Sequence, residues 1–256
     1  MHFTTAEIMT WVGALLWPFL RIGAMLAAAP MFGAQTVTVR IRLAFGFMLA
    51  IIIAPLLPPP PAVDPLSAAG LSIAIQQVLI GVMIGFVMQM VFSAMAQAGE
   101  TIALTMGLGF ASMVDPQGVQ VPVISTYFTI ITTLLFLAMG GHVALIELTL
   151  LSFQAMPISA EGVGRVEFWA LVTWGSTMFR YALLVALPAV AAMLLVNISM
   201  GVITRASPQL NIFAVGFPMM IWLGFILIFL ALPILLPQFS DFLFEAFRLL
   251  GDLLGV

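Results

Sequence analysis

The ionisable residues of this chain are few and scattered. Its 256 residues include ten carboxylates and seven basic side chains, and all seven are arginine because the chain contains no lysine. No adjacent carboxylates are suited to general acid–base work, and the two histidines, His2 and His142, have no partners at metal-ligand spacing. The chain has no cysteine, and it lacks the nucleophile-elbow, zincin and Walker patterns. We therefore expect a protein that is not an enzyme and that uses no metal and no cofactor.

Four ionisable residues stand inside apolar stretches, namely Arg21, Glu100, Glu147 and Arg180. Such residues in a membrane segment raise the hypothesis of a proton or ion relay, as in a secondary transporter for a small solute or ion. The plainer interpretation is that they pair with one another, or with a partner chain, and stabilise packing. We favour the packing interpretation because no stretch carries a cluster of carboxylates.

A different kind of segment, GETIALTMGLGFASMVDPQGVQVP, occupies residues 99–122. It contains four glycines and two prolines, yet no charge occurs between Thr101 and Val114. Its backbone amides cannot face lipid unpaired, so the segment must be buried in protein or line an aqueous path. Met106, Phe110 and Met113 supply bulky side chains, and methionine is flexible enough to seal an irregular gap. These residues leave two interpretations open: a plug in a conduction path, or a re-entrant loop that fills a core.

The composition indicates what class of protein positions these residues. Hydrophobic residues make up 63% of the chain and charged residues only 7%, whereas soluble proteins have about 25% charged residues. The mean hydropathy is +1.24 and the formal net charge is −3. These values exclude a soluble enzyme domain, a disordered chain and a nucleic-acid binder with a basic face. The sequence predicts a single integral membrane unit.

Apolar runs of helical length predict an all-α membrane protein with about six hydrophobic helical segments. The four prolines Pro58–Pro61 end one segment, because proline lacks an N–H and clashes with the preceding turn. A separate short amphipathic helix is expected at Phe239–Leu250. The run lengths are too unequal for a simple bundle in one bilayer thickness. The expected apolar runs are Ile8–Phe32, Leu43–Leu57, Leu66–Ala98, Val123–Met139, Val143–Met156, Phe168–Ile203 and Ile212–Leu236.

Small residues four apart predict close contacts between helices. These pairs are Gly81 with Gly85, Ala24 with Ala28, Ala94 with Ala98, and Ala182 with Ala186. Four amide side chains are candidates for hydrogen bonds between helices: Gln76, Gln77, Gln89 and Asn197. Both features are typical of tightly packed membrane helices, and neither is specific to one function.

Several motifs resemble one family, the FliR/SctT proteins, which are the R-type export-gate proteins of bacterial flagellar and virulence type III secretion systems. The resemblance covers nearly the whole chain and is closer to the flagellar branch. Its most specific motifs are MGLGFASMVDP at 106–116 and PQLNIFAVGFP at 208–218. Further matches are WPFLRI at 17–22, Ala29-Pro30, APLLP at 54–58, QQVLIGVMIGF at 76–86, AGE at 98–100 and Gly141-His142.

The resemblance implies helical hairpins, with a P-like portion at 1–140 followed by a Q-like portion at 141–256. It implies assembly with P-type and Q-type subunits and other export-apparatus membrane components into a closed gate for unfolded flagellar proteins. The gate would lie at the bacterial inner membrane, within the flagellar basal body, with much of the complex toward the periplasmic side. No nucleic acid is expected as a partner.

Within the loop 106–122, the resemblance implies a plug that projects into the channel. Gly107 and Gly109 would provide hinge freedom, Phe110 and Met113 would occlude the pore, and Asp115-Pro116 would end the plug. A secondary transporter and a passive scaffold without a pore remain the alternatives from other classes. The predicted plug residues are Met106, Gly107, Leu108, Gly109, Phe110, Ala111, Ser112, Met113, Val114, Asp115 and Pro116.

Overall fold

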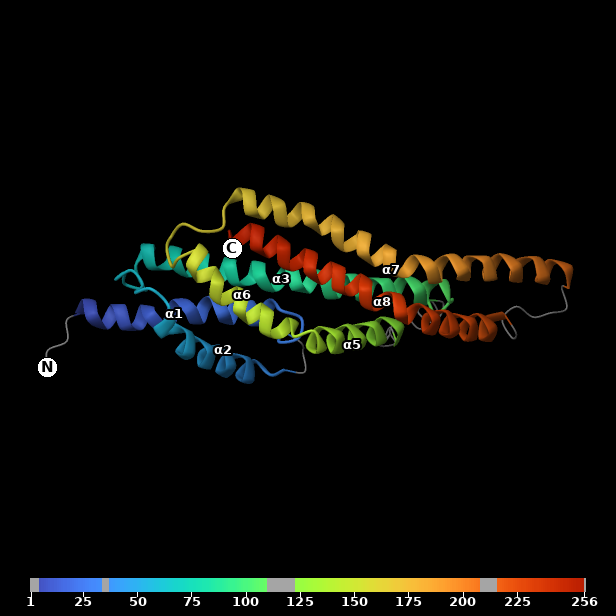
Figure 1. Ribbon diagram of the computed structural model, residues 1–256, viewed down its shortest axis with the longest axis horizontal. Coiled ribbons are helices and arrows are strands. Elements are labelled where there is room, and N and C mark those ends of the chain that lie inside the picture. Colours follow the sequence, from blue (N-terminus) through green and yellow to red (C-terminus); the bar gives the residue numbers. More distant parts are fainter. Residues whose placement is uncertain (1–4, 34–36, 110–122, 208–215, 256) are drawn as a thin grey trace. The chain divides into compact units, whose positions relative to one another are not determined.

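The structure is a computed structural model that describes residues 5–33, 37–109, 123–207 and 216–255. All regular secondary structure in this part of the chain is helical, so the expected all-α class is confirmed. The α-helices are α1 (Thr5–Ala28), α2 (Val39–Ile53), α3 (Ala68–Thr105), α5 (Val123–Ala138), α6 (Gly141–Ala155), α7 (Arg165–Ala206) and α8 (Phe217–Leu254), and a short 3-10 helix, η1 (Ala54–Leu56), follows α2 (Figure 1).

Five helical stretches in the described residues are long and apolar enough to cross a membrane. They are Met9–Ala28 in α1, Val39–Leu56 in α2 and η1, and the whole of α3, α7 and α8. Helices α5 and α6 are long and apolar enough to cross a membrane only when taken as a pair, and the pair is bent by 65° at a short break. If this pair is one span, the described residues contain six membrane-spanning stretches. Gly140 lies at this break with φ +72°, a left-handed conformation that glycine adopts without steric penalty.

The expectation of a separate helix at Phe239–Leu250 is wrong. Helix α8 runs without interruption from Phe217 to Leu254, and it contains Pro233 and Pro237. Each proline removes one helical hydrogen bond. Packing on both sides of Pro237 holds the helix together, since Leu235, Phe239 and Phe242 are all buried at spacings of four and three residues. The polar residues near the end of the chain therefore lie on a continuation of the last apolar helix.

The chain divides into two compact units. The first unit contains Met1–Met90, Phe136–Gly175 and Phe244–Val256, and the second contains Val91–Leu135 and Ser176–Leu243. The expected P-like and Q-like portions at 1–140 and 141–256 stay a prediction.

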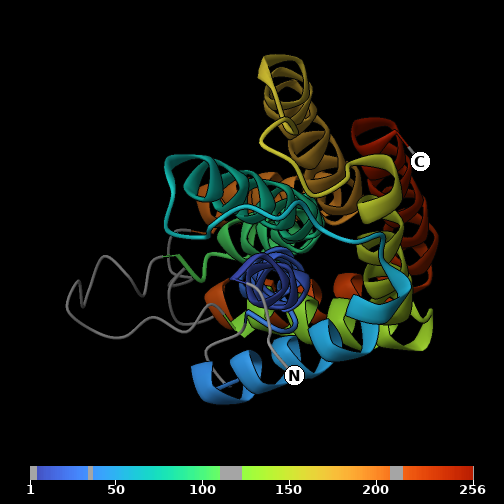
Figure 2. The ribbon, with the colours of Figure 1, turned by 90° about the vertical axis from the view of Figure 1, so that its left-hand side faces the viewer.

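In the first unit, α1 lies between α2 and the first part of α3 (Figures 1 and 2). Helices α1 and α3 approach each other through small residues, as expected. A Cβ atom added at Gly81 would lie 2.9 Å from Ala24 Cβ, and one added at Gly85 would lie 2.6 Å from Ala28 Cβ. These distances are shorter than real Cβ contacts, so α3 needs glycine at both positions to pack against α1.

The second unit is built from the later part of α3, most of α5, the later part of α7 and the first part of α8. Phe92 of α3 meets Phe239 of α8 edge to face with ring centroids 6.4 Å apart. Tyr181 of α7 stacks on Phe242 of α8 at 4.2 Å. Helix α5 is tied to α3 where Ser125 Oγ donates a hydrogen bond of 3.0 Å to the Ala96 carbonyl oxygen. Aromatic contacts and a hydrogen bond between α5 and α3 thus connect helices of this unit.

Candidate functional site

The described part of the predicted plug segment begins with a defined helix end. The Leu108 N–H donates to the Ala103 carbonyl, and the Gly107 N–H donates to the Leu104 carbonyl, both at 3.1 Å. Gly107 has φ +82°. This pair of bonds around a left-handed glycine is a Schellman motif, which satisfies carbonyls that a helix end leaves without partners. Residue 107 must therefore be glycine-like for the chain to leave α3 in this direction.

Two side chains from other helices contact the same helix end. Asn197 of α7 donates from Nδ2 to the Thr105 carbonyl oxygen at 3.3 Å. Met106 is completely buried, and a Cβ atom added at Gly224 of α8 would lie 2.5 Å from Met106 Cγ and 2.6 Å from Sδ. The Met106 side chain therefore occupies the space that a side chain at position 224 would need. The end of α3 is packed against α7 and α8 in the second unit.

Among the other predicted plug residues, Gly107 is buried, while Leu108 and Gly109 are half-buried. The assignment of all these residues to a plug stays a prediction. The rest of the predicted plug lies outside the described residues, and these positions are Phe110, Ala111, Ser112, Met113, Val114, Asp115 and Pro116.

Arg21 forms the most concentrated polar site of the first unit. Its side chain is completely buried in α1. Nε donates to Gln77 Oε1 of α3 at 2.9 Å. Nη1 donates to the carbonyl oxygen and Oγ of Ser152 at 2.8 and 3.0 Å, and Nη2 donates to the Met156 carbonyl oxygen at 2.8 Å. The guanidinium also lies 4.0 Å from the ring centroid of Phe153.

These hydrogen-bond acceptors of Arg21 are all neutral groups, and two of them are carbonyls at the C-terminal end of α6. That end of a helix carries partial negative charge, which stabilises a cation placed there. The ring face of Phe153 adds a cation–π contact. Arg21 thus joins α1, α3 and α6 by planar, multidentate hydrogen bonding, a geometry that lysine cannot supply.

The other three ionisable candidates have different environments. Glu147 of α6 and Arg180 of α7 are exposed in this chain, and Glu100 of α3 is half-buried. Arg21 and Glu147 belong to one unit, but the hydrogen bonds of Arg21 do not include Glu147. No contact among the described residues assembles the four into a relay.

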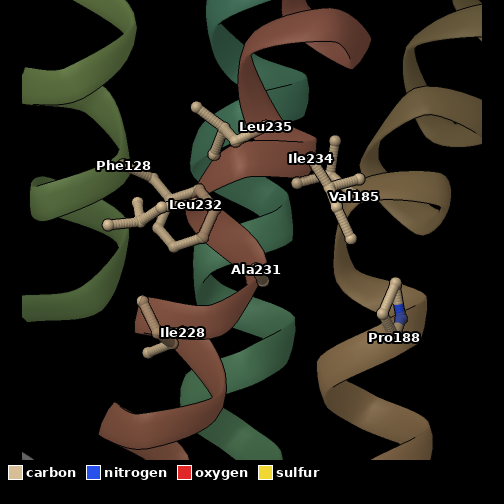
Figure 3. Close-up of a pocket in the computed structure, with 8 residues that line it drawn as sticks. All are labelled: Phe128, Val185, Pro188, Ile228, Ala231, Leu232, Ile234 and Leu235. Carbon is tan, nitrogen blue, oxygen red and sulfur yellow. The ribbon is translucent and has the colours of Figure 1, made fainter.

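The second unit also contains a small apolar pocket between α5, α7 and α8, with a volume of about 10 Å³. Figure 3 shows Phe128 directed from α5 toward Leu232 of α8, with Val185 of α7 beside Ile234. The lining has no charged side chain, and the volume is about the minimum needed to hold one water molecule. In the described part of the chain, no group of three or more His, Cys, Asp or Glu residues is placed to hold a metal ion.

Sequence reasoning found some of these partners and missed others. Of the four amide side chains expected to form hydrogen bonds between helices, Gln77 and Asn197 do so, whereas Gln76 Oε1 is buried without a hydrogen-bond partner among the described residues. The contributions of Ser152, Phe153 and Met156 to the Arg21 site were not predicted. Backbone carbonyls and an aromatic ring carry no polar signal in the sequence, so their role appears only when the helices pack.

These features define an all-α membrane protein in which polar side chains connect helices. A family model described as bacterial export proteins, family 1, matches residues 12–246. The chain therefore belongs to this family of bacterial export proteins. The resemblance to the FliR/SctT proteins that the motifs indicated is confirmed.

Individual relatives match the chain over most or all of its length. The flagellar biosynthetic protein FliR of Pectobacterium carotovorum subsp. carotovorum is 39% identical over 257 residues, which cover 99% of this chain and 97% of the relative. FliR of Escherichia coli K12 is 37% identical, with 100% and 98% covered. FliR of Bacillus subtilis 168 is 30% identical, with 87% of each chain covered. The chain is thus a membrane protein of bacterial protein export, similar to FliR proteins.

Proposed function

We propose that this chain is a non-enzymatic component of the flagellar type III protein export gate. In this role it forms part of a closed channel through which unfolded flagellar proteins pass. The observation that carries the proposal is the similarity to flagellar biosynthetic proteins along nearly the full chain. Helices of membrane-spanning length in this chain also support the proposal, as does a glycine-rich stretch that carries no charge from Thr101 to Val114.

In this proposal, residues Met106–Pro116 act as the plug of the channel. The composition of the segment supports this role, because it combines glycines, methionines and a phenylalanine with no charge before Asp115. The defined end of α3 supports it as well. A plug must start from a fixed point, and the chain leaves α3 at Gly107 through a hydrogen-bonded turn.

We further propose that P-type and Q-type subunits, together with other membrane components of the export apparatus, cover much of the exposed apolar surface. In the most apolar stretches of α2, α7 and α8, only 17%, 28% and 17% of the residues are buried within the chain. Such surface needs lipid or protein neighbours. The complex would lie in the flagellar basal body at the bacterial inner membrane, with much of it toward the periplasmic side.

The decisive experiment removes the plug from the assembled gate. Deleting Gly107–Val114 is expected to let ions or small molecules leak across the membrane, because the deletion removes the occluding side chains Phe110 and Met113. Conductance or small-molecule uptake measures the leak in cells, and co-purification of the P-type and Q-type subunits shows whether the gate still assembles. A second variant replaces the same residues with a Gly-Ser linker of equal length, which keeps the spacing of the chain.

The matched control is Glu161→Ala, a change at an exposed position in the loop that joins α6 and α7. This control should leave both assembly and permeability unchanged. The plug assignment fails if the deletion and the linker variant both assemble and show no more conductance than the control. A result in which assembly changes but permeability never does would favour the passive scaffold.

A further inference from the structure

The end of α3 is attached to two other helices at separate points. The Thr105 carbonyl, one of the carbonyls that a helix end leaves without an intrahelical partner, accepts a hydrogen bond from Asn197 of α7. One residue further on, the Met106 side chain packs where Gly224 of α8 leaves room. Asn197 lies 92 residues from Thr105 in the sequence, so this is a tertiary contact and not a local cap.

Gly224 leaves the space that the Met106 side chain occupies. A methyl group at position 224 would overlap Met106 Cγ and Sδ, because both atoms would lie within 2.6 Å of it. By contrast, a methyl group at Gly201 of α7 would enter open space, with nothing within 4 Å. The two glycines lie in the same unit and in long helices, so Gly201 is a matched control position.

The change in backbone conformation occurs immediately after these contacts. Met106 still donates its N–H to the Ile102 carbonyl in helical fashion, at 3.0 Å. Gly107 then turns left-handed, with φ +82°. Met106 is therefore packed against α8, and Gly107, the next residue, has a left-handed conformation that glycine adopts without steric penalty.

We propose that Met106, Gly224 and Asn197 form an anchor that holds the end of α3 against α7 and α8 and so fixes the point at which the chain leaves α3. Met106 is then a positioning residue of the export gate, and the occluding part of the plug begins after it. This inference rests on the proposed plug function. The anchor itself is a statement about contacts between α3, α7 and α8, and it can be tested without any transport measurement.

The first test measures the contact between Met106 and Gly224 by disulfide cross-linking. The chain contains no cysteine, so introduced cysteines have no competing thiols within it. Met106 Cγ lies 2.5 Å from a Cβ atom added at Gly224. One further carbon–carbon bond of about 1.5 Å separates Cγ from Met106 Cβ, so the two Cβ atoms are at most about 4 Å apart, within disulfide range. M106C/G224C should cross-link readily on mild oxidation in native membranes, whereas the control M106C/G201C should not.

The second test asks whether the anchor positions the gate. Gly224→Ala should raise the leak of the assembled gate by about tenfold over Gly201→Ala, because the overlap with Met106 displaces the end of α3 from which the proposed plug starts. Met106→Ala removes the overlapping atoms, so M106A/G224A should leak much less than Gly224→Ala alone. Asn197→Leu should also raise the leak, through loss of the hydrogen bond to Thr105.

The two sets of results separate the anchor from the plug. If M106C/G224C cross-links no better than its control, the anchor is wrong, whatever the leak of the deletion variant. If it cross-links but the leaks of the two alanine variants simply add, the contact exists and the positioning role is wrong. If deleting Gly107–Val114 produces no leak, the plug function fails, and with it the positioning role, while the cross-link still reports the contact.

Discussion

Arg21 is the only charged side chain among the fully buried residues that the structure describes. A buried charge is tolerated when hydrogen bonds and dipoles replace its hydration. Here three nitrogen atoms of one planar group meet Gln77, Ser152 and Met156, and the Phe153 ring covers one face. The residue therefore connects three helices at one point, and its value lies in specifying their arrangement.

Replacing this residue tests that role. Arg21→Met leaves the polar atoms of Gln77 and Ser152 buried without their donor, so we expect the free energy of unfolding to fall by about 1–3 kcal/mol. Arg21→Lys should lower the free energy of unfolding by a similar amount, because an ammonium group lacks the planar array of donors that reaches these acceptors. Thermal unfolding in detergent measures both. The control is Arg165→Met, at an exposed position where α7 begins. Equal stability of Arg21→Met and the control would contradict this role.

At the scale of elements, the contact between α1 and α3 depends on missing side chains. Gly81 and Gly85 face the backbone and Cβ atoms of α1, which leaves no space for a methyl group. Close approach is the means by which membrane helices gain packing energy, because lipid offers little hydrophobic driving force between them. The small-residue spacing was visible in the sequence, but the identity of the partner helix was not.

Gly81→Ala and Gly85→Ala should each lower stability by about 1–3 kcal/mol, because the added methyl group forces α1 and α3 apart. Gly175→Ala in α7 is the control, since nothing lies within 4 Å of a methyl group there. It should be neutral or slightly stabilising, because alanine favours the helix over glycine. The measurement is the midpoint of thermal unfolding in the same detergent. A midpoint for Gly85→Ala at or above that of the control would exclude tight packing at this point.

Local chemistry explains where two helical regions end or bend, and tertiary packing explains why a third helix continues past its prolines. Pro58–Pro61 end the helical region of α2 and η1, and Gly140 lies at the 65° bend between α5 and α6. In α8, by contrast, Pro233 and Pro237 do not interrupt the helix. A proline ends a helix only when nothing else offsets the lost hydrogen bond, and the buried aromatic residues of α8 do so here.

At the scale of the whole molecule, the exposed apolar surface leads to a prediction about assembly. The purified chain alone in liposomes should conduct little, since the proposed channel needs P-type and Q-type subunits. Affinity isolation of the tagged chain in mild detergent should recover those subunits, and mass spectrometry identifies them. Unrelated membrane proteins of similar abundance provide the background. Coupled transport of a small solute by the chain alone would contradict this prediction and revive the transporter alternative.

The sequence by itself determined that the chain is a membrane protein, that it is helical and to which family it belongs. Each depends on composition, run length or short motifs, and these are properties of neighbouring residues. Thus 63% hydrophobic residues indicated a membrane protein, and the motifs at 106–116 and 208–218 indicated the export family. The locations of Gln77 and Asn197 in apolar runs also indicated hydrogen bonds between helices, which the structure contains.

Only the tertiary structure decided which partners these residues meet. Arg21 reaches Ser152 across 131 residues, and Met106 is buried against Gly224 although a methionine side chain is equally suited to a channel lining. Nothing in the local sequence distinguishes these outcomes, because a buried arginine or methionine is compatible with many neighbours. The choice depends on how closely the helices approach, and that distance is set by side chains far apart in the chain.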